Sequence, residues 1–274
     1  MSVPACIGVF DSGVGGLTVL RALHAQLPGV PLIYVADSAH APYGDRSEAY
    51  IVQRARSISQ FLLEQGAKLI VVACNTATAA AIATLRAEFD LPFVGIEPGI
   101  KPALAQSRSG RVGVLATPAT LRSAKFRALL QAHAAHAAPV LQPCPGLADA
   151  VERGDLQSPE LHAMIRRYCA PLRAAGCDTV VLGCTHYPLI AAAIQAELGT
   201  QVRLLDTAEP VARQAARLWM HRASAERVPP RLYTNGDVAG LRRMAALCGL
   251  ADAQVQSWPT TTLSPQAAIA DPRG

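Results

Sequence analysis

AKLIVVACNTATAAAI (67–82) decides the fold, because its apolar run leads directly through Cys74 into an alanine-rich segment. A short apolar run of this kind is typical of a strand buried on both faces, and the alanine-rich segment is expected to be a helix. CDTVVLGCTHYPLIAAAI (177–194) has the same order, with Cys184 at the equivalent point. The two stretches predict two strand-to-helix turns that each carry a cysteine followed by polar residues.

The composition is that of a globular protein with a large core. The chain has 274 residues, of which 51% are hydrophobic, enough for one large domain or two smaller ones. Its formal net charge is +5, but the arginines are scattered, and the densest clusters are pairs such as Arg166 with Arg167. A nucleic-acid-binding face concentrates its charge more strongly. We therefore expect a solvated surface and no nucleic-acid partner.

The sequence also predicts a cytoplasmic protein with neither a membrane segment nor a metal. Its first residues, MSVPACIGVFDSG, lack the charged and apolar regions of a secretory signal. The uncharged stretch 69–85 approaches the length of a membrane span, but polar residues interrupt it. The seven cysteines form no CxxC pair, which argues against a disulfide framework and against a zinc site.

Apolar runs and amphipathic stretches alternate in the first hundred residues. Leucines at helical spacing predict a helix over 17–27, and Asp45 with Glu48 resembles the capping box of a second helix that ends at Gly66. This alternation predicts a parallel sheet covered by helices on both faces. The predicted strands are 7–11, 30–37, 68–74 and 93–96.

The pattern restarts near residue 111, which indicates an internal duplication. RVGVLATPATL (111–121) repeats CIGVFDSGVGGL (6–17), and the two cysteine stretches repeat each other, at nearly equal offsets of 105 and 110 residues. We predict two pseudo-symmetric α/β domains, each a parallel sheet with helices on both faces, and an active site in the cleft between them. The first domain would comprise 1–97 and 210–274, and the second 98–209. RLYTNGD (231–237) should return as a strand to the first sheet, and 259–274 should be loosely held.

The two cysteines are candidates for proton transfer. In open α/β sheets ligands bind beyond the carboxyl ends of the strands, where helix N-termini favour anions. We expect Cys74 and Cys184 at such N-termini, where the helix dipole and donated hydrogen bonds lower the pKa of a thiol from about 8.5. If the halves face each other, one thiolate removes a proton from a carbon while the opposite thiol delivers one to its other face. This exchange inverts a stereocentre.

The sequence favours racemisation without a cofactor. Pyridoxal phosphate, the usual cofactor of amino-acid racemases, is held by a lysine. The chain contains only Lys68, Lys101 and Lys125, and none of them lies in a polar motif. We therefore expect no cofactor.

Four stretches resemble the signature sequences of bacterial glutamate racemases, within the aspartate/glutamate racemase family: FDSGVGGLTVL (10–20), ADSAHAPYGDRS (36–47), ACNTATAAA (73–81) and LGCTHYPLI (182–190). They occur in the family's order and spacing, and the resemblance covers roughly residues 7–237. It implies an isomerase, independent of pyridoxal phosphate, that interconverts L-glutamate and D-glutamate and supplies this D-amino acid for peptidoglycan synthesis, cell-wall biogenesis and cell shape. It also implies a homodimer and, since the chain begins almost at its first strand, activity without a cell-wall precursor.

The resemblance also implies residue roles. By motif position, Cys74 would take the α-proton of D-glutamate, and Cys184 that of L-glutamate. Asp11 and His186 would assist proton transfer beside the thiols, and Glu152 would be a further catalytic carboxyl group. Substrate carboxylates suit helix N-termini, and an ammonium group suits a carboxylate. The residues that would hold the substrate are Asp11, Ser12, Pro42, Tyr43, Gly44, Asn75, Thr76, Thr117, Thr120, Thr185 and His186.

Three other functions stay open. An aspartate racemase, or one with broad specificity, would share the fold, but such relatives commonly carry glutamate where this chain has His186. A cysteine hydrolase or acyltransferase with His186 as base would leave the second cysteine stretch unexplained. A protein that only binds amino acids would need neither thiol.

Two further stretches have structural interpretations. GVGG (13–16) could hold a phosphate, but Asp11 beside it would repel one, so we expect a turn that lets the backbone approach a small substrate. Asp37 and Asp45 flank Tyr43, and we expect them to cap and brace the tyrosine loop.

Overall fold

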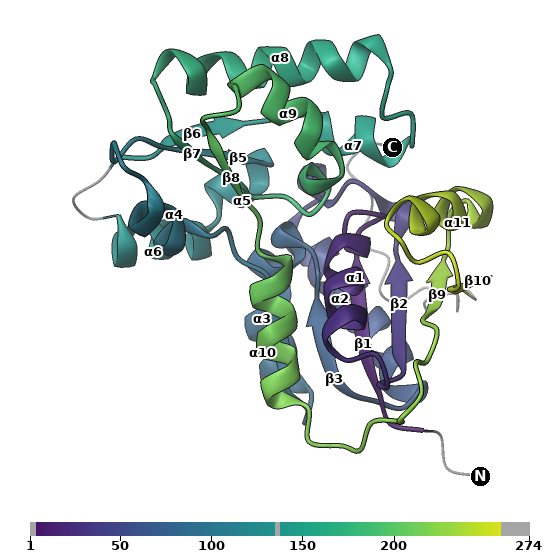
Figure 1. Ribbon diagram of the computed structural model, residues 1–274. Coiled ribbons are helices and arrows are strands. Elements are labelled where there is room, and N and C mark those ends of the chain that lie inside the picture. The colour runs from purple at the N-terminus through teal and green to yellow at the C-terminus, as the bar shows by residue number, and fades with distance from the viewer. Residues whose placement is uncertain (1–3, 135–137, 259–274) are drawn as a thin grey trace.

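All strands in the described part of the chain, residues 4–134 and 138–258, pair in parallel. The computed structural model places them in a six-stranded sheet, in the order β10-β9-β2-β1-β3-β4, and a four-stranded sheet, in the order β6-β5-β7-β8 (Figure 1). We call the two units that surround these sheets the first lobe and the second lobe. The strands are β1 (Cys6–Asp11), β2 (Leu32–Ala36), β3 (Ala67–Val72), β4 (Phe93–Gly95), β5 (Val112–Ala116), β6 (Val140–Pro143), β7 (Thr179–Leu182), β8 (Arg203–Leu205), β9 (Arg231–Thr234) and β10 (Gln254–Ser257).

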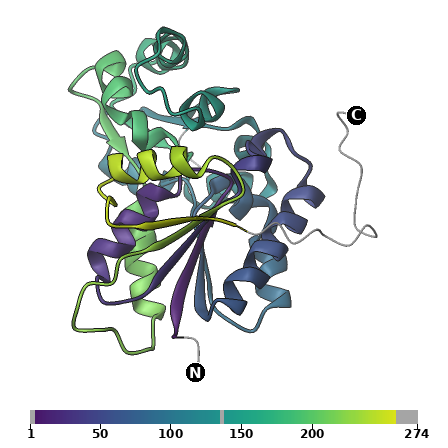
Figure 2. The same cartoon turned by 90° about the vertical axis from the view of Figure 1, so that its right-hand side faces the viewer.

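Helices cover both faces of the larger sheet because its strands are apolar on both sides. Successive strand residues point to opposite faces, so Ile7 and Val9 belong to one buried cluster, and Cys6 and Phe10 to another. Figure 2 shows α1, α10 and α11 on one side of this sheet and α2 and α3 on the other. These helices are α1 (Leu17–Gln26), α2 (Glu48–Glu64), α3 (Asn75–Glu88), α10 (Ala208–Leu218) and α11 (Val238–Leu247).

The second lobe repeats this layered arrangement. Val180 and Leu182 pack with α8 and α9, whereas Val181, between them, packs with α4 and α6 on the opposite face. The helices are α4 (Ile100–Gln106), α5 (Pro118–Arg122), α6 (Ala124–His133), α7 (Leu147–Glu152), α8 (Pro159–Ala174) and α9 (Ala191–Leu198). Short 3-10 helices are η1 (Ser38–His40), η2 (Tyr43–Asp45) and η3 (Tyr187–Ile190).

The strand orders confirm the predicted duplication and fold class. β2-β1-β3-β4 in the first lobe corresponds to β6-β5-β7-β8 in the second. The first lobe then gains β9 and β10 beyond β2, so the prediction that 231–237 returns to the first sheet is confirmed. The exact domain boundaries stay a prediction, and the tail 259–274 lies outside the described residues. None of the described helices has the length and apolar character needed to cross a membrane.

The predicted start of α2 is wrong in detail. Ser47, with extended backbone, caps this helix and accepts a hydrogen bond from the Tyr50 N–H at 3.2 Å. Asp45 lies in η2 instead, so it forms no capping box with Glu48. A serine at the N-cap satisfies a free helix N–H as well as an aspartate does.

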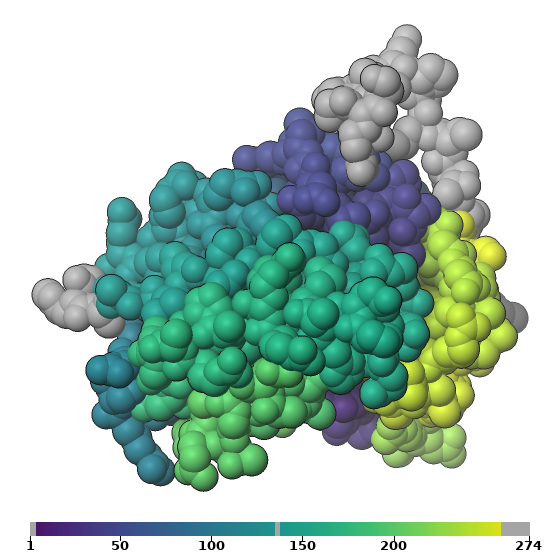
Figure 3. Space-filling model, turned by 90° about the horizontal axis from the view of Figure 1, so that it is seen from above, coloured from purple at the N-terminus to yellow at the C-terminus, as the bar shows by residue number. Residues whose placement is uncertain are grey.

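The two connections between the lobes run side by side. A Cβ at Gly99 would lie 3.2 Å from the Thr207 side chain, and these two residues precede α4 and α10. Seen from above, the second lobe (teal to green) covers the end of the first lobe at which the two connections lie (Figure 3). It is bordered by the blue segment around α2 and by the yellow segment around α11. The carboxyl ends of both sheets therefore meet at the junction between the lobes.

Candidate active site

One cavity at the junction is lined by both Cys74 and Cys184. Its volume is about 20 Å³, room for about one water molecule, whereas pockets for small ligands measure roughly 300–1,000 Å³. The groups around the two thiols are therefore closely packed. The cavity is lined by Ser12, Ala41, Pro42, Tyr43, Gly44, Cys74, Asn75, Thr76, Thr117, Ala148, Asp149, Glu152, Cys184, Thr185 and His186.

Cys74 is the N-cap of α3, as the sequence predicts. Its Sγ accepts a hydrogen bond from the Ala77 N–H at 3.4 Å and lies 3.8 Å from Ser12 Oγ. Burial nevertheless raises the pKa of Cys74 well above its usual value, and the nearby charge of Asp11 raises it further. The Ala77 N–H acts in the opposite direction but is outweighed. The expectation of a lowered pKa is therefore wrong for Cys74.

Cys184 follows β7 but does not cap an α-helix. The residues after it form η3, and α9 begins only at Ala191. The predicted helix N-terminus at Cys184 is therefore wrong, because Pro188 and the turn before it delay the helix. The partner of Cys184 is instead a side chain, His186, whose Nδ1 lies 3.8 Å from the sulfur.

His186 is held between Cys184 and the carboxylate of Glu152. Its Nε2 lies 2.7 Å from Glu152 Oε2, and its side chain is 5% exposed. Burial acts to lower the pKa of His186, but the hydrogen bonds with Cys184 and Glu152 outweigh it and keep this pKa well above its usual value. Burial likewise acts to raise the pKa of Glu152, but His186 and other donors lower it. The pair is therefore an imidazolium and a carboxylate.

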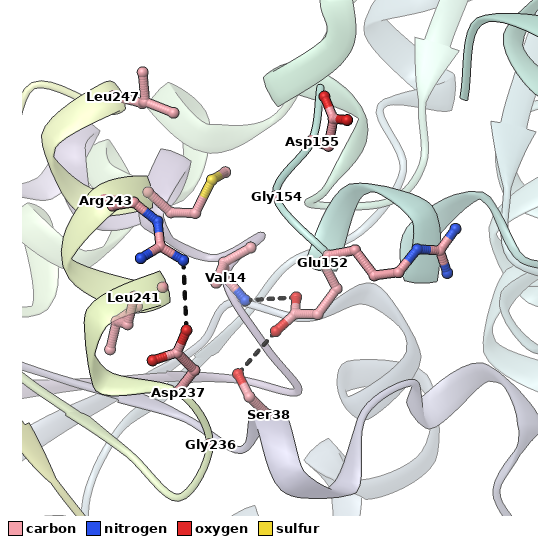
Figure 4. A pocket seen from close by; sticks show the side chains of 13 residues that line it. Val14, Ser38, Glu152, Gly154, Asp155, Gly236, Asp237, Leu241, Arg243 and Leu247 are labelled. Carbon is pink, nitrogen blue, oxygen red and sulfur yellow. Dashed lines mark hydrogen bonds and ion pairs between the residues drawn. The ribbon is translucent and has the colours of Figure 1, made fainter. Parts of the chain in front are cut away.

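Glu152 also joins the second lobe to the first (Figure 4). Its Oε2 accepts from the Val14 N–H at 2.9 Å, and its Oε1 accepts from Ser38 Oγ at 2.8 Å. Val14 lies in the turn after β1, and Ser38 begins η1 after β2, both in the first lobe. The carboxylate thus orients His186 through Nε2, and it also links the two lobes.

The glycine-rich turn, residues 13–16, lies against side chains of the second lobe. A Cβ at Gly13 would lie 2.2 Å from Glu152 Oε2, and one at Gly15 would lie 2.6 Å from His186 Nδ1. A side chain at either position would therefore displace Glu152 or His186. The turn therefore lets the backbone of the first lobe approach catalytic candidates of the second lobe, and the predicted approach to a substrate stays a prediction.

Asp11 lies behind the cavity wall, completely buried. Its Oδ1 accepts from Ser12 Oγ at 2.9 Å, and its Oδ2 accepts from Thr185 Oγ1 of the second lobe at 2.8 Å. Burial raises the pKa of Asp11, although His186 and the two hydroxyl donors act to lower it. Asp11 thus reaches the cavity only through Ser12 and Thr185, which separate it from any bound ligand in the closed structure.

Hydroxyl and amide groups form the other end of the cavity. Thr76 Oγ1 lies 3.1 Å from Thr117 Oγ1 and 3.3 Å from Thr120 Oγ1, so hydroxyls of both lobes converge. The Nδ2 of Asn75 is buried without a hydrogen-bond partner among the described residues. Because buried polar groups are almost always satisfied, this free donor and the hydroxyls suit an acceptor such as a carboxylate.

The cavity contains most of the predicted residues but not all of them. Asp11 and Thr120 stand one layer behind it, whereas the other predicted residues line it. Sequence reasoning missed Ala41, Ala148 and Asp149. Asp149 lies three residues before Glu152 on α7, and this helical spacing was the signal that could have identified it. No cluster of three or more metal-ligating side chains occurs in residues 4–134 and 138–258.

Comparisons with known proteins agree on one family. Residues 7–215 match the Asp/Glu/hydantoin racemase family. The chain is 50% identical to a glutamate racemase of Pseudomonas aeruginosa over 235 residues, 84% of this chain and 89% of the relative. It is 55% identical to a glutamate racemase of Methylococcus capsulatus over 211 residues, 77% and 78% of the two chains.

Solved structures give the same result. A glutamate racemase of Escherichia coli, crystallised with L-glutamate and the activator UDP-MurNAc-ala, has a TM-score of 0.81 and 31% identity, covering 92% of this chain and all of that one. A glutamate racemase of Bacillus anthracis has the same TM-score and identity and covers 94% of this chain and 97% of its own. An allantoin racemase of Klebsiella pneumoniae, 22% identical with a TM-score of 0.53, shares the fold.

Proposed function

This chain belongs to the Asp/Glu/hydantoin racemase family, and from that membership we propose that it interconverts L-glutamate and D-glutamate. One observation carries the mechanism: two cysteines from equivalent positions of duplicated lobes line the same cavity. The names of the relatives favour glutamate over aspartate as the substrate. Racemisation is reversible, so each cysteine acts as the base in one direction and as the acid in the other.

We assign the two thiols to opposite faces of the substrate's Cα. The Cys74 thiolate removes the α-proton of D-glutamate, and the electron pair left on Cα spreads onto the α-carboxylate. The Cys184 thiol then gives a proton to the other face, which yields L-glutamate and leaves Cys184 as thiolate. In the reverse direction Cys184 is the base and Cys74 the acid. Hydrogen bonds to the α-carboxylate from Asn75 and the threonine hydroxyls stabilise the charge as it develops.

His186 and Glu152 support the Cys184 half of this reaction. The imidazolium of His186 stabilises the thiolate that Cys184 becomes when it gives up its proton. Glu152 keeps the imidazolium charged and correctly turned. Asp11 orients the hydroxyls of Ser12 and Thr185, which face the substrate.

Deuterium incorporation tests the reaction. Purified protein incubated with L-glutamate in deuterated water should lose the circular dichroism of L-glutamate while one deuteron appears at Cα, measured by mass spectrometry. A hydrolase or a binding protein would incorporate no deuteron. Parallel incubation with L-aspartate identifies the substrate: loss of the aspartate signal with an unchanged glutamate signal would overturn glutamate as the substrate.

The cellular role follows from the product. We infer that D-glutamate made by this protein enters peptidoglycan synthesis in the cytoplasm, which agrees with seven buried cysteines that form no disulfide. Cell fractionation tests this location. The homodimer that the resemblance implies is tested by light scattering of the purified protein.

A further inference from the structure

Asp37, immediately after β2, is a completely buried carboxylate whose oxygens are fully occupied. Its Oδ1 accepts from Arg54 Nη2 at 2.7 Å and from Asn235 Nδ2 at 2.6 Å. Its Oδ2 accepts from Arg54 Nε at 2.9 Å and from Tyr43 Oη at 2.5 Å. The prediction that Asp37 braces the tyrosine loop is confirmed by the last of these bonds. Asp37 has no acceptor site left for a substrate.

Arg54, on α2, supplies the positive charge for this arrangement. Its guanidinium binds both oxygens of Asp37 in the two-pronged geometry that lysine cannot reproduce. Burial acts to lower the pKa of Arg54, but the bonds to Asp37 raise it, so the group stays charged. On its outer side the guanidinium lies 5.3 Å from the ring centre of Trp258, within the range of a cation–π interaction.

Trp258 is fixed by the C-terminal strand β10. Its N–H donates to Thr234 O at 2.6 Å, its ring centre lies 5.8 Å from that of Phe61, and it is only 8% exposed. A continuous path of buried contacts therefore connects the end of β10 to Arg54, then Asp37 and finally Tyr43. No part of this path except Tyr43 lines the cavity.

The Tyr43 loop is the part of the first lobe that reaches across to the second. Tyr43 is 1% exposed and lines the cavity together with Pro42 and Gly44. A Cβ at Gly44 would lie 3.6 Å from the Thr117 side chain at the start of α5. The position of this loop therefore decides the shape of the cavity and the place of the Thr117 hydroxyl beside it.

We propose that Arg54, which packs against the Trp258 ring, is a positioning residue that holds Tyr43 and residues 41–45 in their substrate-binding conformation. This inference rests on the proposed racemase function. It makes Trp258, the residue after β10, contribute to substrate binding although it does not line the cavity. Because the chemistry at the two thiols is untouched, loss of this support should weaken substrate binding much more than turnover.

The same helix offers a matched control. Arg56 binds Glu88 with the same two-pronged geometry, Nε to Oε2 at 2.7 Å, but both side chains are exposed and neither lines the cavity. Arg56→Met therefore removes an equivalent ion pair without disturbing the Tyr43 loop. A merely structural role of Arg54 would lower the melting temperature and leave KM unchanged in the folded fraction.

The test compares Arg54→Met, Arg54→Lys, Trp258→Ala and Arg56→Met. We expect Arg54→Met to raise KM for both enantiomers about 10-fold with kcat within about 3-fold of wild type, and Arg54→Lys to restore part of the loss. Trp258→Ala should raise KM about 3-fold. Without substrate, hydrogen exchange of amides 38–47 should accelerate in these three variants and stay unchanged in Arg56→Met.

Each outcome decides the proposal. A folded Arg54→Met protein with wild-type KM and wild-type exchange at 38–47 would overturn it. If Arg54→Met does not fold, Arg54→Lys and Trp258→Ala decide in its place, and unchanged KM and exchange in both would overturn it equally. Wild-type protein that does not racemise glutamate would instead refute the proposed function, while the exchange measurement still tests the loop.

Discussion

The two cysteines occupy equivalent places in duplicated lobes, yet their surroundings differ in kind. Cys74 follows β3 and meets neutral groups, the Ala77 N–H and the Ser12 hydroxyl. Cys184 follows β7 and meets an imidazolium, since His186 is charged by its contacts with the thiol and with Glu152. Duplication therefore fixed where each thiol stands, whereas the chemistry around it diverged.

The nearby carboxylates also act differently on the two cysteines. The carboxylate nearest Cys74, Asp11, acts to raise the pKa of this thiol. The carboxylate on the other side, Glu152, acts through His186 and favours positive charge beside Cys184. The surroundings of Cys74 thus disfavour a thiolate, whereas a positively charged side chain lies beside Cys184.

The largest effect should come from the thiols themselves. Cys74→Ser and Cys184→Ser should each lower kcat/KM for both enantiomers by about 10³-fold or more, because a serine hydroxyl cannot act as the base at neutral pH. Circular dichroism of each enantiomer measures the rates. Cys169→Ser, a buried cysteine outside the cavity, is the control and should racemise at the wild-type rate. Full activity of either active-site variant would end the two-base proposal.

The contrast between the thiols is tested next at His186. His186→Asn should lower kcat/KM by about 10²-fold, the usual size of an acid–base contribution. The two directions must lose kcat/KM equally, since the enantiomers have equal free energy. Primary kinetic isotope effects distinguish the two directions. In His186→Asn, the isotope effect with α-deuterated L-glutamate should be larger than in wild type, and that with α-deuterated D-glutamate should be smaller. Equal changes for the two enantiomers would show that His186 serves both thiols alike.

Glu152 should have a smaller effect, with a shift in pH dependence. Glu152→Gln keeps the shape and removes the charge that helps to raise the pKa of His186. The pKa of His186 then falls, so this residue loses its proton at a lower pH. The alkaline limb of the pH profile, where kcat/KM declines, therefore moves to lower pH. We expect about 10-fold lower activity at pH 8 and less at pH 6.5. Ser38→Ala removes only the bond to Oε1 and should leave the limb in place.

The same ion pair also predicts how stability depends on pH. The pKa of Glu152 is lowered in the fold, so its contribution is lost as pH falls below its usual value of 4.5. The pKa of His186 is raised, so its contribution is complete below 6.5 and is lost as pH rises through the raised value. Urea unfolding at pH 4, 6 and 9 should show this dependence in wild type and a weaker one in Glu152→Gln.

The sequence predicts the inner strands well but misses three of the four edge strands in the described residues, for a physical reason. β1, β3, β5 and β7 are covered on both faces, so they read as unbroken apolar runs. β6, β8 and β10 are edge strands whose side chains are largely exposed or half-buried, and all three were missed. A short strand without an apolar run leaves almost no signal in the sequence.

The candidate site likewise has features that the sequence predicts and features that it does not. Repetition between the two lobes points to Cys74 and Cys184, because local sequence encodes a strand followed by a turn. The bonds of Glu152 to Val14 and Ser38 join residues 138 and 114 positions apart, and no local pattern encodes such contacts. The close neighbours of the glycine turn could not be predicted for the same reason, since they belong to the other lobe.

The smallest effect should come from Ser12, and it sharpens the contrast from the Cys74 side. Ser12→Ala removes one neutral neighbour of Cys74, while the Ala77 N–H remains, so kcat/KM should fall only about 5-fold. In a Cys184→Ser background, the pH dependence of iodoacetamide labelling at the Cys74 peptide reports the pKa of this thiol. Ser12→Ala should raise that pKa slightly, whereas Asp11→Asn should lower it, because the Asp11 charge opposes a thiolate. A loss at Ser12→Ala as large as at His186→Asn would mean that a neutral hydroxyl does for Cys74 what an imidazolium does for Cys184. The two halves would then differ in structure but not in chemistry.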